Sequence, residues 1–576
     1  MAETTAGEAA PKKSTWAAIA VFFERRMLVM LALGFAAGLP NLLIFDTLSA
    51  WLRQANIPLT TITLLGLATL AYSLKFLWAP VVDRTAIPGL TRLIGHRRSW
   101  MLAAQGVIIV GLYLVSGSNP AANLALVAGF AVLVAFASAT QDIVIDAWRI
   151  EAAGDERQGA MAAMYQWGYR IAILTAGIAP LLIADNWSWN LAYAAMAALM
   201  AIGIAAVLLA PKENPRPVMA PLLPDDIAAK PVPEAIEWIA RLLLLLFGAF
   251  VFGLGFTGQF VMAEWAGGFF GQSAESLTPF REAWAARPWG VFIQVAFAFA
   301  GLAMMIAAAW PIPGRTTRPG VYFVRSYGEP IRDFFTRFPH TAGLILAMIC
   351  CYRLSDFVLN IMNPFYLDLG FDLTTIAEVR KGFGVAMLML GVGAAGWGIA
   401  RFGLMRALIF GAFAGPVSNL VFAWLATQGP DWRAFAVAIM VDNVTAGFAG
   451  TVLIAYMSSL TSAGFTATQY ALFSSLYALP GKLISAHSGG IVEASARGAA
   501  PGGPFAGLTG LFSRLPAQSF AAGAEPLGIA PAALGAGYFV FFFYSCLIGV
   551  AALILALIIA RRDANIQRTK ETPAPA

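Results

Sequence analysis

Fourteen long apolar stretches, separated by mostly short loops, decide what this chain can fold into. A helix needs about 20 apolar residues to cross the hydrocarbon core of a bilayer. The stretches do not alternate as barrel strands do, so the need to satisfy backbone groups inside lipid favours helices. We therefore expect an all-α integral membrane protein. The predicted spans are near 27–46, 59–80, 99–116, 121–150, 160–184, 190–210, 241–262, 288–311, 341–361, 373–399, 404–425, 431–460, 466–492 and 536–560.

The basic residues of the loops predict the orientation of the chain. With the N-terminus inside, the cytoplasmic segments carry 25 Lys and Arg residues, the outer loops carry six, and six lie within spans. This is the positive-inside bias, and it places both termini in the cytoplasm. The polar start of the chain has no short apolar core with a cleavage site, so we expect no cleaved signal peptide. The net charge of +6 follows membrane topology and does not indicate a nucleic-acid partner.

The spans are organised as two groups of six around an inserted pair. Two long cytoplasmic connections, 211–240 and 313–340, enclose the spans 241–262 and 288–311, which carry little charge. Glycine-rich faces at Gly34–Gly38 and Gly391–Gly398 predict close helix contacts. The predicted parts are a cytoplasmic tail (1–26), a six-helix bundle (27–210), the linkers with two additional helices (211–340), a second six-helix bundle (341–560) and a cytoplasmic tail (561–576). The second bundle includes a long periplasmic loop, 493–535, in which Leu508–Leu515 could form a short surface helix.

The loop between the second and third spans of each half carries a related motif. The first reads Ala79-Pro-Val-Val-Asp83-Arg84, followed by Gly95-His-Arg97-Arg98, and the second reads Gly396-Trp-Gly-Ile-Ala400-Arg401-Phe-Gly403-Leu-Met-Arg406. Both resemble the pattern G-x-x-x-D-R-x-G-R-R of the major facilitator superfamily. The first copy lacks the leading Gly and has an insertion, and the second lacks the Asp. Two copies at corresponding positions indicate a transporter built from repeated halves.

An acidic stripe lies within the fourth span. Asp142, Asp146 and Arg149 stand at i, i+4 and i+7, which is one face of a helix. Low dielectric and a like charge one turn away both favour the protonated form of a carboxyl group. We therefore expect Asp142 to handle the coupling proton, with Asp146 in gating or pairing. The alternative is that Asp146 and Arg149 form a structural bridge at the cytoplasmic mouth, which leaves Asp142 as the one candidate.

Cations within the spans predict an anionic substrate. Lys75 and Arg170 lie in the first half, and Arg353 and Lys381 lie in the second, so charge-assisted hydrogen bonds could reach a ligand from both sides. Charged groups inside spans usually face a cavity or a partner. Asp356 and Asp442 partly balance these cations. The alternative is neutral packing, in which Arg353 pairs with Asp356 and Lys75 pairs with Asp46.

The chain shows no pattern for catalysis, metal binding or a cofactor. Its three cysteines, Cys350, Cys351 and Cys546, lie in or beside apolar spans and imply neither a metal site nor a disulfide framework. The three histidines are scattered, and no H-E-x-x-H, G-x-S-x-G or P-loop spacing occurs. We expect no catalytic residue, no metal and no cofactor.

Four segments together resemble the AmpG muropeptide permeases. They are Gly34-Phe-Ala-Ala-Gly38-Leu-Pro40, Lys75-Phe-Leu-Trp-Ala-Pro80-Val-Val-Asp83-Arg84, Ala139-Thr-Gln141-Asp142-Ile-Val-Ile-Asp146-Ala-Trp148 and Phe465-Thr-Ala-Thr468-Gln469-Tyr-Ala-Leu-Phe. Arg353-Leu-Ser-Asp356 and Asp442-Asn443, followed by Gly447 and Gly450, fit the same family. The resemblance covers nearly all twelve core spans. It implies the major facilitator fold, here with two extra helices between the halves.

The resemblance also implies a function. The family imports N-acetylglucosaminyl-anhydro-N-acetylmuramyl peptides from periplasm to cytoplasm, is thought to use the proton gradient, and serves cell-wall recycling and β-lactamase induction. We therefore expect a monomeric, multi-pass protein of the bacterial inner membrane, whose partners are protons, a muropeptide and the lipid bilayer. The expected substrate-binding residues are Lys75, Arg170, Arg353, Asp356, Lys381, Asp442, Asn443 and Gln469. The expected gating residues are Asp83, Arg84, Arg149 and Arg401.

Two features depart from the family pattern. Its members carry their additional spans after the twelfth, and their outer loop is shorter than 493–535. The alternatives are therefore a related transporter of another anionic solute such as acetyl-CoA, a membrane-embedded enzyme acting on lipid-linked sugars, and a non-transporting receptor. The outer loops contain few acidic residues and offer no obvious catalytic cluster, and the retained acidic stripe speaks against the receptor.

Overall fold

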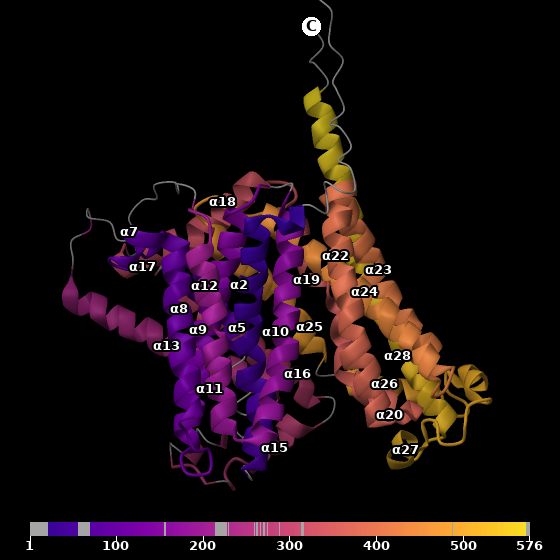
Figure 1. The fold of residues 1–576 in the computed structure, drawn as a ribbon. Helices are drawn as coiled ribbons and strands as arrows, with labels where there is room; N and C mark the ends of the chain where they lie inside the picture. Colours follow the sequence, from indigo (N-terminus) through magenta and orange to yellow (C-terminus); the bar gives the residue numbers. More distant parts are fainter. Residues whose placement is uncertain are drawn as a thin grey trace, which may run out of the picture. The chain divides into compact units, whose positions relative to one another are not determined.

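The computed structural model describes residues 21–571 except 56–69, 155–156, 214–226, 228–229, 259, 261–262, 265–266, 269–270, 274, 287–288, 311, 313–315 and 486–487. Every regular element of this described part is helical (Figure 1). The chain divides into two compact units. The main unit comprises Met1–Pro215 and Phe338–Ala576, and the inserted unit comprises Arg216–Arg337.

The first half of the main unit is a helical bundle. Its elements are α2 (Arg25–Leu42), η2 (Leu43–Thr47), α3 (Leu48–Gln54), α5 (Leu70–Leu74), η4 (Lys75–Leu77), α6 (Ala79–Arg84), α7 (Leu90–Ile94), α8 (His96–Ser116), α9 (Leu124–Glu151), α10 (Gln158–Asn186), α11 (Trp189–Leu199) and α12 (Ala201–Leu209).

The second half contains more breaks within its helices. Its elements are α19 (Ala342–Cys351), η7 (Leu354–Ile361), α20 (Met362–Leu369), α21 (Leu373–Ile376), η8 (Ala377–Phe383), α22 (Gly384–Phe402), α23 (Leu404–Ala426), α24 (Trp432–Ser459), α25 (Thr466–Ser485), α26 (Ser488–Gly498), η9 (Ala506–Phe512), α27 (Ala521–Ala524), η10 (Glu525–Leu527) and α28 (Pro531–Glu571).

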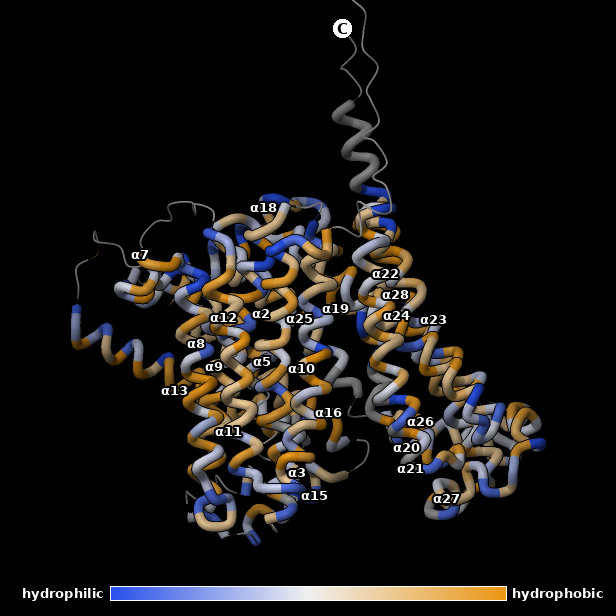
Figure 2. Tube along the Cα trace, viewed as in Figure 1, coloured by the Kyte–Doolittle hydropathy of each residue, from blue (hydrophilic) through white to orange (hydrophobic). Residues whose placement is uncertain are grey.

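The lengths of the helices agree with a membrane protein. Ten described helices are long and apolar enough to cross a bilayer, or eleven if the broken pair Arg318–Arg337 and Ala342–Asp356 counts as one span. Figure 2 shows apolar residues along the length of the helices, with polar residues gathered towards many of their ends. The all-α membrane fold expected from the sequence is confirmed. The predicted span 59–80 lies partly outside the described residues.

Glycines allow the helices of each half to touch at the backbone. A Cβ atom at Gly168 of α10 would lie 1.9 Å from the carbonyl oxygen of Leu31 in α2, and one at Gly34 would lie 2.3 Å from that of Tyr165. In the second half, a Cβ atom at Gly391 of α22 would lie 2.1 Å from the carbonyl oxygen of Val444 in α24. No side chain fits at such distances, so the close contacts predicted at Gly34 and Gly391 are confirmed.

The inserted unit is built on a helical pair. Its elements are α13 (Pro231–Thr257), α15 (Thr278–Ala285), α16 (Trp289–Ala309), α17 (Arg318–Phe323), η6 (Val324–Gly328) and α18 (Glu329–Arg337). Helices α13 and α16 pack closely, because Gly255 lies against the backbone of Ala298 and Gly301 lies against the backbone of Phe252. The buried Arg241 of α13 donates to the carbonyl oxygens of Ala308 and Trp310 at 2.7 and 2.8 Å, which joins neighbouring ends of the pair.

The long segment 493–535 is folded onto the second half. The expected surface helix at Leu508–Leu515 is a 3₁₀ helix at Ala506–Phe512, whose last residue is buried. Phe512 and Phe520 enter the same apolar cluster as Tyr538 of α28 and Phe365 of α20. The backbone N–H of Phe520, which has a φ of 63°, donates to the carbonyl oxygen of Asp368. This apolar side-chain content explains why the segment packs onto the bundle.

Candidate functional site

The acidic stripe of α9 meets two cations inside the first half. Lys75 Nζ lies 3.4 Å from Asp146 Oδ2, and Arg149 Nη2 lies 3.5 Å from Asp146 Oδ1. Lys75 comes from η4, a 3₁₀ turn that interrupts the second span. Such interruptions are tolerated in membranes where they line a cavity or are buried in protein. All three side chains are nearly inaccessible, so this is a buried ionic cluster.

Asp142 stands one helical turn from this cluster and forms no ion pair with any residue that the structure describes. Its Oδ1 atom is buried and has no hydrogen-bond partner among the residues that the structure describes. Asp146 and Asp142 are both among the groups whose charge acts on Lys75, and the larger effect comes from Asp146. The bridge between Asp146 and Arg149, considered above as the alternative, is present. Lys75 takes Asp146 as its partner, and the Asp46 side chain lies outside the described residues.

Arg149 also reaches the other half of the main unit. Its Nη1 atom donates to Ser458 Oγ at 2.8 Å, and its guanidinium lies over the ring of Tyr470, 5.1 Å from the centroid. Ser458 belongs to α24 and Tyr470 to α25. The buried cluster of the first half is therefore connected directly to two helices of the second.

A second connection between the halves uses the loop motif, and we name it the Asp83 latch. Asp83 Oδ1 accepts from Arg97 Nη2 at 2.7 Å, while Asp83 Oδ2 accepts from both the backbone N–H and the hydroxyl of Thr468 at 2.7 Å. Thr468 lies in the first turn of α25, where a carboxylate is favoured by the exposed N–H groups and the helix dipole. Arg97 also binds Glu151 at 2.7 Å. Nearby, the guanidinium of Arg84 lies over the ring of Phe465.

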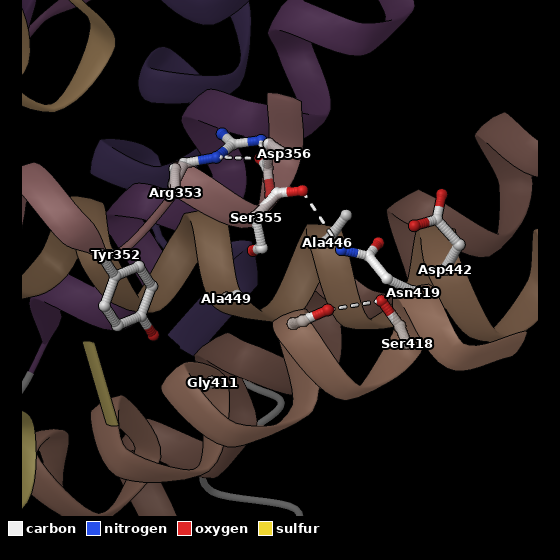
Figure 3. Close-up of a pocket in the computed structure, with 11 residues that line it drawn as sticks. Tyr352, Arg353, Ser355, Asp356, Gly411, Ser418, Asn419, Asp442, Ala446 and Ala449 are labelled. Atoms are coloured by element: carbon white, nitrogen blue, oxygen red, sulfur yellow. Dashed lines mark hydrogen bonds and ion pairs between the residues drawn. The ribbon is translucent and has the colours of Figure 1, made fainter. Parts of the chain in front are cut away.

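The second half contains a small polar cavity. It has a volume of about 50 Å³ and is lined by Tyr352, Arg353, Ser355, Asp356, Gly411, Gly415, Ser418, Asn419, Asp442, Ala446 and Ala449 (Figure 3). Arg353 and Asp356 form an ion pair there, as the neutral-packing alternative expects. Both side chains are about one-third exposed, at 32% and 33%, so the pair is not sealed within the protein. The cavity has room for a few water molecules and is too small for a disaccharide.

Arg170 brings a cation of the first half towards this region. It lies on α10, and the charge of Arg353 acts on it across the boundary between the halves. Its Nε atom is buried and has no hydrogen-bond partner within the described part of the chain. Arg170 and Arg353 thus come from opposite halves, and an anion bound between them would be attracted by both guanidinium groups.

The remaining expected site residues are dispersed. Asn443 donates to the carbonyl oxygen of Ile439 in its own helix. Gln469 accepts from the N–H of Ser462 at 2.8 Å, which places it beside the Asp83 latch. Arg401 is exposed at the end of α22 and lies over the ring of Phe402. Lys381 is in the π-helical turn η8, and its side chain lies outside the described residues.

Sequence reasoning missed the partners that join the halves. Ser458, Thr468 and Tyr470 were not expected to act in gating, and neither were Arg97 and Glu151. Arg97 could have been found, because it belongs to the same loop motif as Asp83. A serine or threonine on a helix carries no such signal, since its role depends on which helix lies opposite.

Comparisons with known proteins agree with this architecture. Residues 30–283 match the family model described as Major Facilitator Superfamily. The solved proton:xylose symporter XylE aligns with a TM-score of 0.50 at 10% identity, covering 92% of this chain and 94% of that chain, which shows the fold alone.

Sequence relatives are more specific. The anhydromuropeptide permease of Escherichia coli (strain K12) is 30% identical over 478 residues, covering 82% of this chain and 76% of the relative. Putative transporter AmpG 4 of Rickettsia felis is 25% identical over 476 residues, covering 82% of this chain and 91% of the relative. With this identity over most of both sequences, the chain belongs to the AmpG-type muropeptide permease family of the major facilitator superfamily.

Proposed function

We propose that this protein is a proton-coupled importer of anhydromuropeptides in the bacterial inner membrane, with both termini in the cytoplasm. The named relatives support the substrate class, and the distribution of basic loop residues supports the orientation. Import would supply peptidoglycan recycling and, through it, β-lactamase induction. The observation that carries the proposal is Asp142, a buried carboxyl group that has no ion pair among the described residues and stands beside a cluster that reaches both halves.

Asp142 is the proposed proton site because a change in its charge would act on the neighbouring Lys75 and Asp146. When Asp142 is protonated, Lys75 stays with Asp146, as in the structure. When the proton leaves, the new carboxylate competes with Asp146 for the same ammonium group. Two unit charges 4 Å apart interact by about 4 kcal/mol at an effective dielectric of 20, so the competition is large enough to redistribute conformations.

The competition for Lys75 is transmitted through Arg149. Once Lys75 turns towards Asp142, Asp146 keeps Arg149 as its remaining cation and attracts it more strongly. Arg149 is then drawn away from Ser458 and Tyr470 in the second half. The protonation state of Asp142 thus changes a contact that must break when the two halves separate. The contact between Arg149 and the second half would therefore differ in strength between the two protonation states of Asp142, and coupling requires such a difference.

The substrate is proposed to bind between Arg170 and Arg353. A muropeptide carries carboxylates, which guanidinium groups bind by charge-assisted hydrogen bonds. Since the cavity beside Arg353 is about 50 Å³, the pathway must widen before the sugar and peptide can enter. Separation of the halves would supply that space. Asp83, Arg84 and Arg149 would then act as gating residues that are released on opening.

The test is uptake of a labelled anhydromuropeptide by proteoliposomes under an imposed pH gradient. We expect Asp142→Asn to abolish gradient-driven accumulation while counterflow exchange persists. Asp185→Asn is the matched control, because Asp185 is an exposed carboxyl group near the end of α10. Undiminished accumulation by the Asp142 variant would move the proton site elsewhere. Failure of the unmodified protein to transport the muropeptide would reject the substrate assignment.

A further inference from the structure

The helix that follows the inserted pair exposes an apolar stripe. The run Arg318–Arg337 comprises α17, η6 and α18 without a gap. Val324, Ile331 and Phe335 are 43%, 43% and 46% exposed. Ile331 and Phe335 stand at i and i+4 of α18, so they share one side of the helix, while Val324 lies in the preceding π-helical turn η6. Pro330 and Phe334 of the same run are buried.

The start of this helix is fixed to the first turns of α13. Thr317 Oγ1 donates to Glu237 Oε1 at 3.0 Å, and the guanidinium of Arg241 lies 4.9 Å from the ring centroid of Phe323. Trp238 of α13 packs against the rings of Tyr322 and Phe323, with centroids 5.5 Å apart in both cases. The run therefore begins where α13 still carries charged residues, before its continuous apolar stretch.

The start of the run lies at the level where the apolar stretch of α13 begins. Arg241 connects the third turn of α13 to the last residues of α16, so α16 ends at the level where the apolar stretch of α13 begins. Beyond Arg241, α13 exposes a continuous apolar surface that includes Leu242, Leu243 and Leu246. A surface of this kind on a membrane-spanning helix faces lipid. The run Arg318–Arg337 begins beside the turns of α13 that directly precede this surface.

The charges of the run favour a position at the membrane surface over a position inside the bilayer. Six of its 20 residues are charged: Arg318, Arg325, Glu329, Arg332, Asp333 and Arg337. Each ionisable residue at the centre of a bilayer costs about 2.5–3.5 kcal/mol on insertion scales. The excess of arginine over acidic residues matches the anionic headgroups of a bilayer surface. Arg332 is exposed next to the stripe.

We propose that Arg318–Arg337 is an interfacial helix of the inserted unit, which binds the surface of an anionic bilayer. Ile331 and Phe335 enter the boundary between headgroups and acyl chains, and Arg332 binds lipid phosphate. The occupant of the stripe is lipid, because the run starts beside the turns of α13 that directly precede its apolar stretch and is accompanied by positive charge. This would hold the inserted pair to one membrane face independently of any transport step.

The experiment places an environment-sensitive fluorophore along the helix of the full-length protein. The native cysteines Cys350, Cys351 and Cys546 are first replaced, and single cysteines are then introduced at Ile331, Phe335 or Thr336. Thr336 is the matched control, because it is exposed and polar and adjoins Phe335. Each labelled protein is reconstituted in vesicles of brominated phosphatidylcholine, with or without phosphatidylglycerol.

We expect blue-shifted emission and bromine quenching at positions 331 and 335, and weaker changes at position 336. We also expect Arg332→Glu to reduce quenching at position 335 in phosphatidylglycerol vesicles but not in neutral ones. Equal, unquenched emission at all three positions would place the stripe in water and overturn the proposal. Blue-shifted emission without bromine quenching would identify a protein segment as the occupant and overturn it as well. An Arg332 effect that is the same in both lipids would overturn the role of the anionic headgroups.

Discussion

The Asp83 latch offers the sharpest test of how the two halves are held together. The substitution Asp83→Asn keeps the shape of the side chain but leaves a single acceptor oxygen. In the structure one oxygen receives Arg97 and the other receives two donors of Thr468, all at 2.7 Å. The amide group introduced by the substitution must therefore point its own N–H donors either at Arg97 or at Thr468. One side of the latch has to be lost.

The size of the effect follows from the bonds that break. A hydrogen bond to a charged group contributes about 1.5–3 kcal/mol. If the side facing Thr468 is lost, the contact between the halves weakens by about that amount, which changes an equilibrium by about 10- to 150-fold. Arg97 keeps Glu151 as a partner, so the first half itself should stay folded.

The opening of the latch can be measured at Ala471. Ala471 belongs to α25, is 1% exposed and packs among residues of the first half such as Ile143 and Met164. In a background without other cysteines, we expect Asp83→Asn to raise the labelling rate of a cysteine at position 471 by about one to two orders of magnitude, on the energy range above. Thr468→Val should raise it less, because the backbone N–H of the residue still reaches Asp83.

Thr466→Val provides the matched control for that measurement. Thr466 is on the same helix and is buried, but its hydroxyl donates to Ser462 within its own half. The same change of side chain therefore removes a bond that does not cross between the halves. The reasoning is refuted if Thr466→Val and Thr468→Val raise labelling equally, or if Asp83→Asn leaves it unchanged.

Three further outcomes are expected. Gly168→Ala should lower the free energy of unfolding in detergent by about 1–3 kcal/mol, because the added Cβ atom would lie 1.9 Å from the carbonyl oxygen of Leu31. Gly129→Ala is the control and should leave stability unchanged, because no atom lies near the added Cβ atom. Arg353→Gln should weaken binding of a muropeptide by about 1.5–3 kcal/mol but not of the peptide-free disaccharide, and equal losses would favour a structural Arg353–Asp356 bridge. Burial raises the pKa of Asp368, while the hydrogen bond from the Tyr538 hydroxyl lowers it. A raised pKa means that the folded state favours the protonated carboxyl group, so the protection of segment 493–535 from proteolysis should fall as pH rises through that pKa. Tyr538→Phe should move this loss to higher pH, and an unchanged profile would exclude Asp368 as its cause.

The sequence predicted the membrane fold well because apolar length is a local property. Each span can be recognised from its own residues, and the stripe of Asp142, Asp146 and Arg149 follows from helix periodicity alone. Partner choice could not be predicted in the same way. Whether Asp146 takes Arg149, Lys75 or both depends on where η4 places Lys75, and a 3₁₀ turn within an apolar stretch leaves no clear mark in the sequence.

The breaks in the helices share a property that only the structure reveals. Lys75 lies in the 3₁₀ turn η4, Asp356 in the 3₁₀ helix η7 and Lys381 in the π-helical turn η8. Short 3₁₀ or π stretches within helices often mark hinges or functional sites. Three of the charged residues that the sequence singles out within the spans thus stand at such breaks. Of the two arginines proposed to meet substrate, Arg353 directly precedes the break η7, whereas Arg170 lies within the continuous helix α10.

On the proposed mechanism, the proton and the substrate assist each other through charge. A protonated Asp142 leaves one unit less of negative charge near the pathway, so the excess of Lys75, Arg149, Arg170 and Arg353 over the remaining carboxylates is larger. An anionic peptide then binds more favourably to the protonated protein. Because linkage is reciprocal, the bound anion must raise the affinity of the protein for the proton by the same factor. A transporter arranged in this way loads both ligands together from the side with the higher proton concentration, which is the condition for import driven by the proton gradient.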